Sequence, residues 1–181
     1  VYFRCAMCYN VENRYIVYLK LREKYMKINT CCFIGHRVIN ETEELKSQLC
    51  EIIERLIVDE NVDTFLFGSK SRFNSLCLEL VSQIKEKHTH IKRVYIRAEY
   101  PLIDEDYKKY LLKYHEDTYY PNEMLGAGKS IYVKRNFEMI NKSRFCVIYY
   151  DSSYCPDTRK SGTKIAFDYA TKNKKRIIKL A

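Results

Sequence analysis

The chain has 181 residues, with 32 Lys or Arg against 23 Asp or Glu and a formal net charge of +9. This length is typical of one domain that buries a sizeable core. The basic residues are spread along the chain without a Lys/Arg-rich block, which leaves a dedicated nucleic-acid arm unsupported and favours a solvated basic surface.

The first 25 residues differ from the rest. They contain no Gly or Pro, and charges at Arg4, Glu12 and Arg14 interrupt any apolar run. This pattern fits neither a membrane span nor an export signal. Because Met26 leads directly into a strand-like segment, we hypothesise that residues 1–25 are an extension outside the natural protein. Residues 26–181 would then form a single domain.

The cysteines favour a reducing compartment. The chain has eight, and Cys31, Cys32 and Cys146 fall inside apolar strand-like runs, where a thiol packs as a small hydrophobe. Without a secretory signal, we predict free thiols and a cytoplasmic location. Cys5 and Cys8 have the spacing of half a zinc site, but no suitable second pair follows, so no metal is predicted.

Short apolar runs alternate with segments of helical period from residue 30 onward. They predict five strands at 30–34, 64–67, 92–97, 144–150 and 176–180. Helices are predicted at 41–59, 71–87 and 104–114, from 129 onward, and at 163–171. Fully apolar strands between amphipathic helices are typical of a parallel sheet covered on both faces. We therefore predict an α/β fold with a Rossmann-like open parallel sheet of about five strands and helices on both faces.

Ligands of such sheets bind beyond the carboxyl ends of the strands. The residues there are Gly35, His36 and Arg37 after the first strand, and Gly68, Ser69, Lys70 and Ser71 after the second. Glycines permit close backbone approach, while basic side chains and helix-start N–H groups attract an anion. Structural turns and helix capping explain the glycines and serines as well. Neither loop matches the dinucleotide fingerprint or the Walker A pattern, which argues against classical NAD or ATP sites.

The last third of the chain contributes a second group of anion-binding features. Residues 129–181 suggest a helix, a buried strand, a loop, a turn of Ser161, Gly162 and Thr163, another helix and a last strand. This order places Arg135 and a helix N-terminus at the same edge of the sheet. The turn offers N–H groups at the positive end of a helix dipole, and Arg135 offers a planar cationic fork. Together they predict an anion clamp for a phosphate or a nucleotide.

A long connection, residues 98–128, follows the third strand. Connections of this length are usually lids, interfaces or other functional segments. Its tyrosines would stack on a base or, as we favour, pack the segment onto the sheet. They are Tyr100, Tyr107, Tyr110, Tyr114, Tyr119 and Tyr120. Glu99 is the best-placed carboxylate for a ribose hydroxyl or for acid–base chemistry, and a surface salt bridge explains it almost equally well.

The chain from Cys31 to Ala181 resembles the SLOG superfamily, the Rossmann-like fold shared by DNA-processing protein A and the LOG nucleotide hydrolases. The likeness is greatest to its uncharacterised YpsA-like bacterial members, and it rests on residues 30–37, 65–69, 132–139 and 161–166. It implies a nucleotide or nucleotide-derived ligand at this strand edge. Arg135 is similar to the arginine that LOG enzymes place beside the sugar phosphate. Gly162 and Thr163 are similar to the Gly-Thr of their phosphate turn.

Two departures from LOG enzymes separate binding from catalysis. Arg159, Lys160 and Ser161 stand where those enzymes have Pro-Gly-Gly, and Ala166 occupies the position of their catalytic glutamate. Asp168 comes two residues later, which on a helix turns it by about 200° to another face. The resemblance to LOG enzymes therefore implies ligand binding in this chain more strongly than it implies catalysis.

Three functions follow from these observations. The first is a nucleotide-binding sensor or regulatory module without a cofactor or membrane partner. The second is a hydrolase that cleaves the N-glycosidic bond of a nucleoside monophosphate, with Arg135 and Glu99 as catalytic candidates. The third is single-stranded nucleic-acid binding, supported only by the basic charge and the tyrosines. The sequence leaves a homo-oligomer open.

Overall fold

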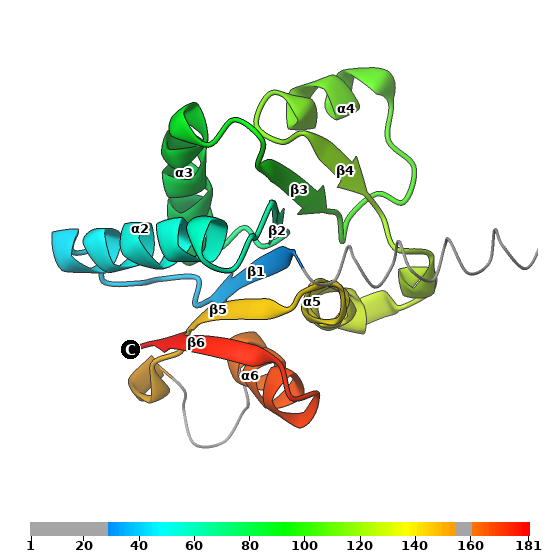
Figure 1. The fold of residues 1–181 in the computed structure, drawn as a ribbon. Coiled ribbons are helices and arrows are strands. Elements are labelled where there is room, and N and C mark those ends of the chain that lie inside the picture. Colours follow the sequence, from blue (N-terminus) through cyan, green and yellow to red (C-terminus); the bar gives the residue numbers. More distant parts are fainter. Residues whose placement is uncertain (1–28, 155–160) are drawn as a thin grey trace, which may run out of the picture.

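The computed structural model describes residues 29–154 and 161–181, which form one six-stranded, all-parallel sheet in the order β4-β3-β2-β1-β5-β6 (Figure 1). The strands are β1 (Thr30–Gly35), β2 (Thr64–Phe67), β3 (Lys92–Ile96), β4 (Asp117–Tyr119), β5 (Phe145–Tyr149) and β6 (Arg176–Leu180). The helices are α2 (Glu43–Val58), α3 (Arg72–Lys87), α4 (Glu105–Leu112), α5 (Ile131–Lys142) and α6 (Gly162–Lys172). Short 3-10 turns are η1 (Asn122–Met124), η2 (Gly128–Ser130) and η3 (Ser152–Tyr154). The predicted N-terminal extension and the Cys5–Cys8 pair lie outside the described residues.

The predicted fold class is confirmed, with one strand more than expected. β4 extends the sheet beyond β3 through the parallel pairs Val94 with Asp117 and Ile96 with Tyr119. Residues 98–128 therefore include a complete crossover, α4 followed by β4, and are not only a lid. A strand of three residues at a sheet edge is too short for an alternating pattern to reveal it.

Both faces of the sheet are covered, as predicted, because consecutive strand residues point to opposite sides. In β1, Cys31 and Phe33 join a hydrophobic cluster with residues of α2 and α3, whereas Cys32 and Ile34 join a second cluster with residues of α5 and α6. Figure 1 shows these two pairs of helices on opposite sides of the sheet. The sheet is thus held between two apolar layers, and its carboxyl edge is rigidly supported.

The thiols in the strands pack as predicted. Cys31, Cys32 and Cys146 are fully buried, and each is a free cysteine. Burial raises the pKa of Cys31, because the apolar core disfavours a thiolate. These thiols therefore serve as small apolar side chains within the core.

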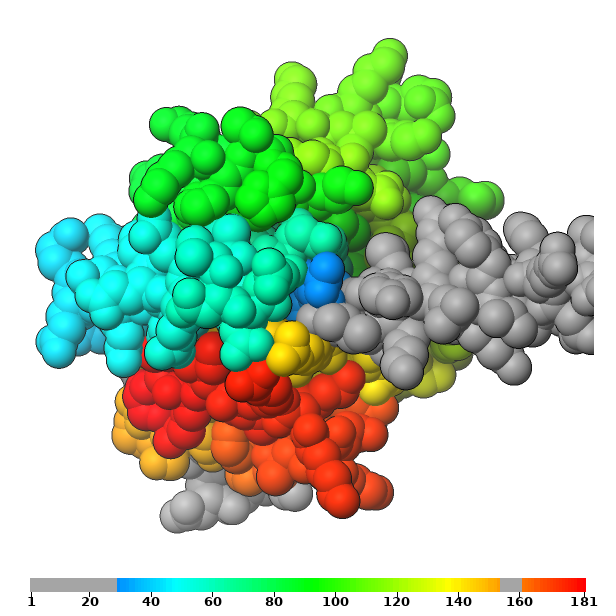
Figure 2. Space-filling view, in the orientation of Figure 1, coloured from blue at the N-terminus to red at the C-terminus, as the bar shows by residue number. Residues whose placement is uncertain are grey.

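The tyrosines of α4 pack differently from our expectation. The rings of Tyr100, Tyr107, Tyr110 and Tyr114 contact one another in series, and those of Tyr110 and Tyr114 are 53% and 51% exposed. Tyr100 is 63% exposed, so the predicted packing onto the sheet is wrong for these three tyrosines, and within α4 only Leu111 is buried. The space-filling view in Figure 2 shows this segment standing at one end of the molecule, beyond α2 and α3. In the described part of the chain, no helix has the length and hydropathy required to cross a bilayer.

Candidate functional site

The candidate site lies at β1, where the order of the strands in the sheet changes direction. β1 pairs with β2 on one side and with β5 on the other, so the loops after these strands diverge. In open α/β sheets this divergence leaves a crevice at the carboxyl edge. The order of strands therefore creates a cavity before any particular side chain is considered.

A cavity of about 680 Å³ occupies this crevice. Its lining is Gly35, His36, Arg37, Gly68, Ser69, Lys70, Tyr95, Ala98, Glu99, Tyr132, Arg135, Asn136, Ser161, Gly162 and Thr163. All the ligand-binding candidates named from the sequence are among them. Sequence reasoning missed Tyr95, Ala98, Tyr132 and Asn136, although Tyr132, three residues before Arg135, shares its side of α5.

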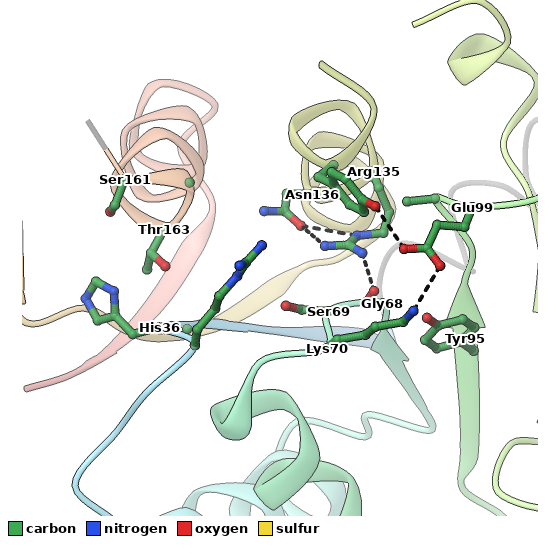
Figure 3. A pocket seen from close by; sticks show the side chains of 15 residues that line it. His36, Gly68, Ser69, Lys70, Tyr95, Glu99, Arg135, Asn136, Ser161 and Thr163 are labelled. Atoms are coloured by element: carbon green, nitrogen blue, oxygen red, sulfur yellow. Dashed lines mark hydrogen bonds and ion pairs between the residues drawn. The ribbon is translucent and has the colours of Figure 1, made fainter. Parts of the chain in front are cut away.

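Arg135 forms the floor of the cavity, and its guanidinium is held in place by neutral groups (Figure 3). Its side chain is 5% exposed, Nη1 donates to the Gly68 carbonyl, and Nε and Nη2 donate to Oδ1 of Asn136 at 3.3 and 3.0 Å. Burial lowers the pKa of Arg135, because desolvation penalises the charged form, yet a guanidinium stays protonated in proteins. Within residues 29–154 and 161–181, no carboxylate forms an ion pair with it. Glu99 attracts the guanidinium through space but is bonded to Lys70 and Tyr132, so a buried charge with no carboxylate in direct contact favours an anionic ligand.

Two of the glycines are required by their neighbours in the protein. A Cβ at Gly68 would lie 2.7 Å from Cδ of Arg135 and 2.9 Å from the Ile96 carbonyl oxygen. A Cβ at Gly35 would lie 2.4 Å from the ring of Phe73. Gly68 therefore leaves space for the aliphatic part of the Arg135 side chain, and Gly35 leaves space for the ring of Phe73. The structural explanation of these glycines is sufficient without a ligand.

Asn74, which the sequence did not single out, organises the loop after β2. Its Oδ1 accepts from the N–H groups of Gly68 and Ser69 at 3.1 and 3.2 Å, and its Nδ2 donates to the Phe33 carbonyl at 2.8 Å. Asn74 thus satisfies the N–H groups of Gly68 and Ser69, which the sequence had suggested for an anion. Ser71 is the N-cap of α3, as the capping explanation predicts. The loop instead offers Lys70 and the Ser69 hydroxyl.

Replacing Asn74 with alanine is expected to lower the free energy of unfolding by about 3 kcal/mol, because buried N–H and carbonyl groups would lose their partners. Chemical denaturation monitored by circular dichroism measures this loss. The matched control is Gln83→Ala on the exposed side of α3, which should change stability by less than about 0.5 kcal/mol. Equal effects of the two substitutions would show that Asn74 does not brace the loop.

The N-terminus of α6 faces the cavity from the other side. Ser161 is its N-cap and accepts from the Lys164 N–H at 3.1 Å. Gly162 and Thr163 supply first-turn N–H groups, which have no acceptor inside the helix and carry the positive end of its dipole. A Cβ at Gly162 would meet no described residue within 4 Å, and Gly162 and Thr163 both line the cavity.

His36 and Arg37 follow β1, and they differ in exposure and in their contacts with the protein. Arg37 is exposed, and no described carboxylate or carbonyl contacts its guanidinium. His36 is buried, with Nε2 at 3.1 Å from the Asp151 backbone nitrogen and 3.2 Å from its carbonyl oxygen. His36 therefore fastens the loop after β1 to the end of β5, while Arg37 is available to a ligand.

Glu99 forms the wall of the cavity beyond β3. Its Oε2 accepts from Lys70 Nζ at 2.9 Å and its Oε1 from the Tyr132 hydroxyl at 2.8 Å. The hydrogen bond from Lys70 and then the one from Tyr132 hold the pKa of Glu99 below its usual range. The predicted salt bridge therefore exists, and it lies at the rim of the cavity. An ionised carboxylate accepts hydrogen bonds but has no proton to donate.

The charges of the lining are unequal. Among the described residues, the cavity is lined by three cationic side chains, Arg37, Lys70 and Arg135, and by one carboxylate, Glu99, and the dipole of α6 adds further positive potential. The described residues contain no group of three His, Cys, Asp or Glu side chains that would hold a metal ion. This lining suits an organic anion with about two negative charges.

No protein-family model matches the chain, and no curated protein matches it either. The resemblance to the SLOG superfamily stays a prediction from the sequence. The function of this chain is therefore inferred from the geometry of the cavity.

Proposed function

We propose that this chain binds a nucleotide or a nucleotide-derived molecule, with its phosphate group between Arg135 and the N-terminus of α6. The observation that carries the proposal is the buried guanidinium of Arg135, which neutral acceptors orient but no described carboxylate neutralises. A phosphate would supply that charge and would accept two parallel hydrogen bonds from the planar fork. The likeness of Arg135 and of the Gly162-Thr163 turn to LOG phosphate sites supports the same assignment.

The charge of the lining favours a phosphate monoester. Such a group carries nearly two negative charges at neutral pH, against the surplus of cations contributed by Arg37, Lys70 and Arg135. Helix N-termini bind phosphates through the same N–H groups that α6 leaves without intrahelical acceptors. The cavity volume, about 680 Å³, lies within the usual range for small-molecule sites.

Binding is favoured over hydrolysis by the carboxylates near the cavity. Ala166, at the position of the LOG glutamate, is 1% exposed and packs within the core cluster beneath α6. Asp168 pairs with Lys164 along the same helix. Glu99 is already ionised and engaged by Lys70, so it is poorly suited to general acid catalysis. We therefore propose a sensor or regulatory module in the reducing cytoplasm.

Isothermal titration of the full chain with inorganic phosphate and with the common ribonucleoside 5′-monophosphates tests this proposal. Saturable binding at one site per chain is expected, with at least one nucleotide binding more tightly than phosphate. Chromatography of the same mixtures should detect no free base. Base release would establish the hydrolase instead, and the absence of binding by every anion would contradict the proposal. Binding only to single-stranded nucleic acid, with a steep salt dependence, would support the third function.

A further inference from the structure

The carboxylate of Glu99 keeps hydrogen-bonding capacity on the side of the cavity. Lys70 and Tyr132 each donate to a different oxygen, at 2.9 and 2.8 Å. A carboxylate accepts about four hydrogen bonds, so about two positions remain for a ligand. Because each oxygen is already held, the plane of the carboxylate is fixed, and each oxygen can accept one further hydrogen bond.

The loop that carries Glu99 is built to hold one conformation. Tyr100, the next residue, has a φ of 56°, in the left-handed region that a side chain makes unfavourable. Arg97 braces the loop by donating through Nη1 to the carbonyls of Tyr100 and Pro101, at 2.7 and 3.3 Å. Backbone strain of this kind persists only where the surroundings impose it, and it concentrates at ligand sites. Glu99 is therefore positioned before a ligand arrives, which reduces the entropy cost of binding.

The position of Glu99 relative to Arg135 restricts what can lie beside it. Glu99 follows β3 and Gly68 follows β2, and neighbouring strands are separated by about 4.8 Å. Arg135 donates to the Gly68 carbonyl, Figure 3 shows Glu99 on the same edge of the sheet, and the charge of each group affects the pKa of the other. A phosphate held by Arg135 would be repelled by Glu99, and the part of the ligand near Glu99 must donate hydrogen bonds. A cationic group is disfavoured there by Lys70 and Arg135.

We infer that Glu99 binds the vicinal hydroxyls of a ribose, so that the cavity selects ribonucleotides over 2′-deoxyribonucleotides. This inference rests on the proposed function, because it assigns the sugar of the same ligand whose phosphate Arg135 holds. Two adjacent hydroxyls match the two remaining acceptor positions of a carboxylate, whereas a deoxyribose offers one. Glu99 is then a specificity-determining residue that hydrogen-bonds the ligand, and Lys70 and Tyr132 position it.

The test compares each ribonucleoside 5′-monophosphate with its 2′-deoxy counterpart, by isothermal titration of the full chain. The wild type is expected to bind the ribose form about tenfold to a hundredfold more tightly, the strength of a hydrogen bond to a charged group. Glu99→Gln keeps the shape but removes the charge and one acceptor, and should bring this ratio close to unity. Glu86→Gln removes an exposed carboxylate of α3 outside the cavity and should keep the wild-type ratio.

Inorganic phosphate separates this inference from the proposed function. The Glu99→Gln variant should bind phosphate at least as tightly as the wild type does, because it loses a nearby negative charge and releases Lys70. Phosphate binding with equal affinity for the ribose and deoxyribose forms would overturn the inference and leave the proposed function intact. An unchanged preference in Glu99→Gln would also overturn it. Failure of the wild type to bind phosphate or any nucleotide would refute both.

Discussion

Replacing Arg135 with glutamine is expected to weaken the binding of a nucleoside monophosphate by about a hundredfold or more. Removing one partner of a buried, hydrogen-bonded charge pair typically costs 2 to 5 kcal/mol, about thirtyfold to several thousandfold in affinity. Glutamine preserves a donor for the Gly68 carbonyl, so the loop after β2 retains part of its support. Isothermal titration of wild type and variant with the same nucleotide measures the loss.

The stability of the same variant distinguishes a binding role from a structural one. No described carboxylate forms an ion pair with the buried charge of Arg135, so the substitution relieves the desolvation cost of that charge while it removes some of the hydrogen bonds that the guanidinium donates. We therefore expect the free energy of unfolding to change by less than about 1 kcal/mol while binding is lost. Arg55→Gln, which removes an exposed arginine of α2, is the matched control and should keep wild-type affinity. If the two variants bound the nucleotide equally well, Arg135 would not be the phosphate ligand.

The second large effect is expected from Gly162→Asp at the start of α6. A Cβ there meets no atom of the described residues within 4 Å, so the variant is expected to fold normally. An acidic residue in the first helical turn interacts favourably with the dipole, and loss of a glycine reduces the entropy of the unfolded chain, so stability should rise by about 0.5 to 1 kcal/mol. The new carboxylate would occupy the space in front of the turn and repel a phosphate. We expect affinity to fall about a hundredfold, which corresponds to about 2.7 kcal/mol.

Gly162→Ala provides the matched control for this effect. It adds the same Cβ without charge, so any change in binding that it causes reports volume alone. A small loss of affinity in Gly162→Ala together with a large loss in Gly162→Asp, measured on equally stable proteins, is the expected pattern. Equal affinity of the aspartate variant and the wild type would place the anion away from α6.

The sequence predicts well the strands that are formed by an apolar run of at least four residues. The expected strands at 64–67 and 176–180 match β2 and β6, and those that became β1 and β5 differ by one residue at an end or at both ends. Alternate residues of these strands pack into the two hydrophobic clusters on opposite faces of the sheet. Apolar residues therefore follow one another along the strand without the alternation of a half-exposed strand. β4 was missed because three residues beside an exposed helix carry too little apolar surface to mark a strand.

The composition of the cavity was predictable for a different reason. Parallel strands end at one edge, so residues that immediately follow β1, β2 and β3 had to gather there. The orientation of the side chains and N–H groups within these loops was not predictable from the sequence. The capture of the Gly68 and Ser69 N–H groups by Asn74 depends on a side chain from one helical turn inside α3, and the bracing of Glu99 by Tyr132 joins residues 33 positions apart.

A crystal of the full chain soaked with sodium tungstate, a phosphate mimic with strong anomalous scattering, tests the central claim most directly. It locates the preferred anion site without knowledge of the base or the sugar. We predict that the strongest anomalous peak lies within hydrogen-bond reach, about 2.7 to 3.2 Å from anion oxygen to donor nitrogen, of Arg135 or of the Gly162 and Thr163 N–H groups. A strongest peak elsewhere on the molecule, with this cavity empty, would contradict the proposed phosphate site.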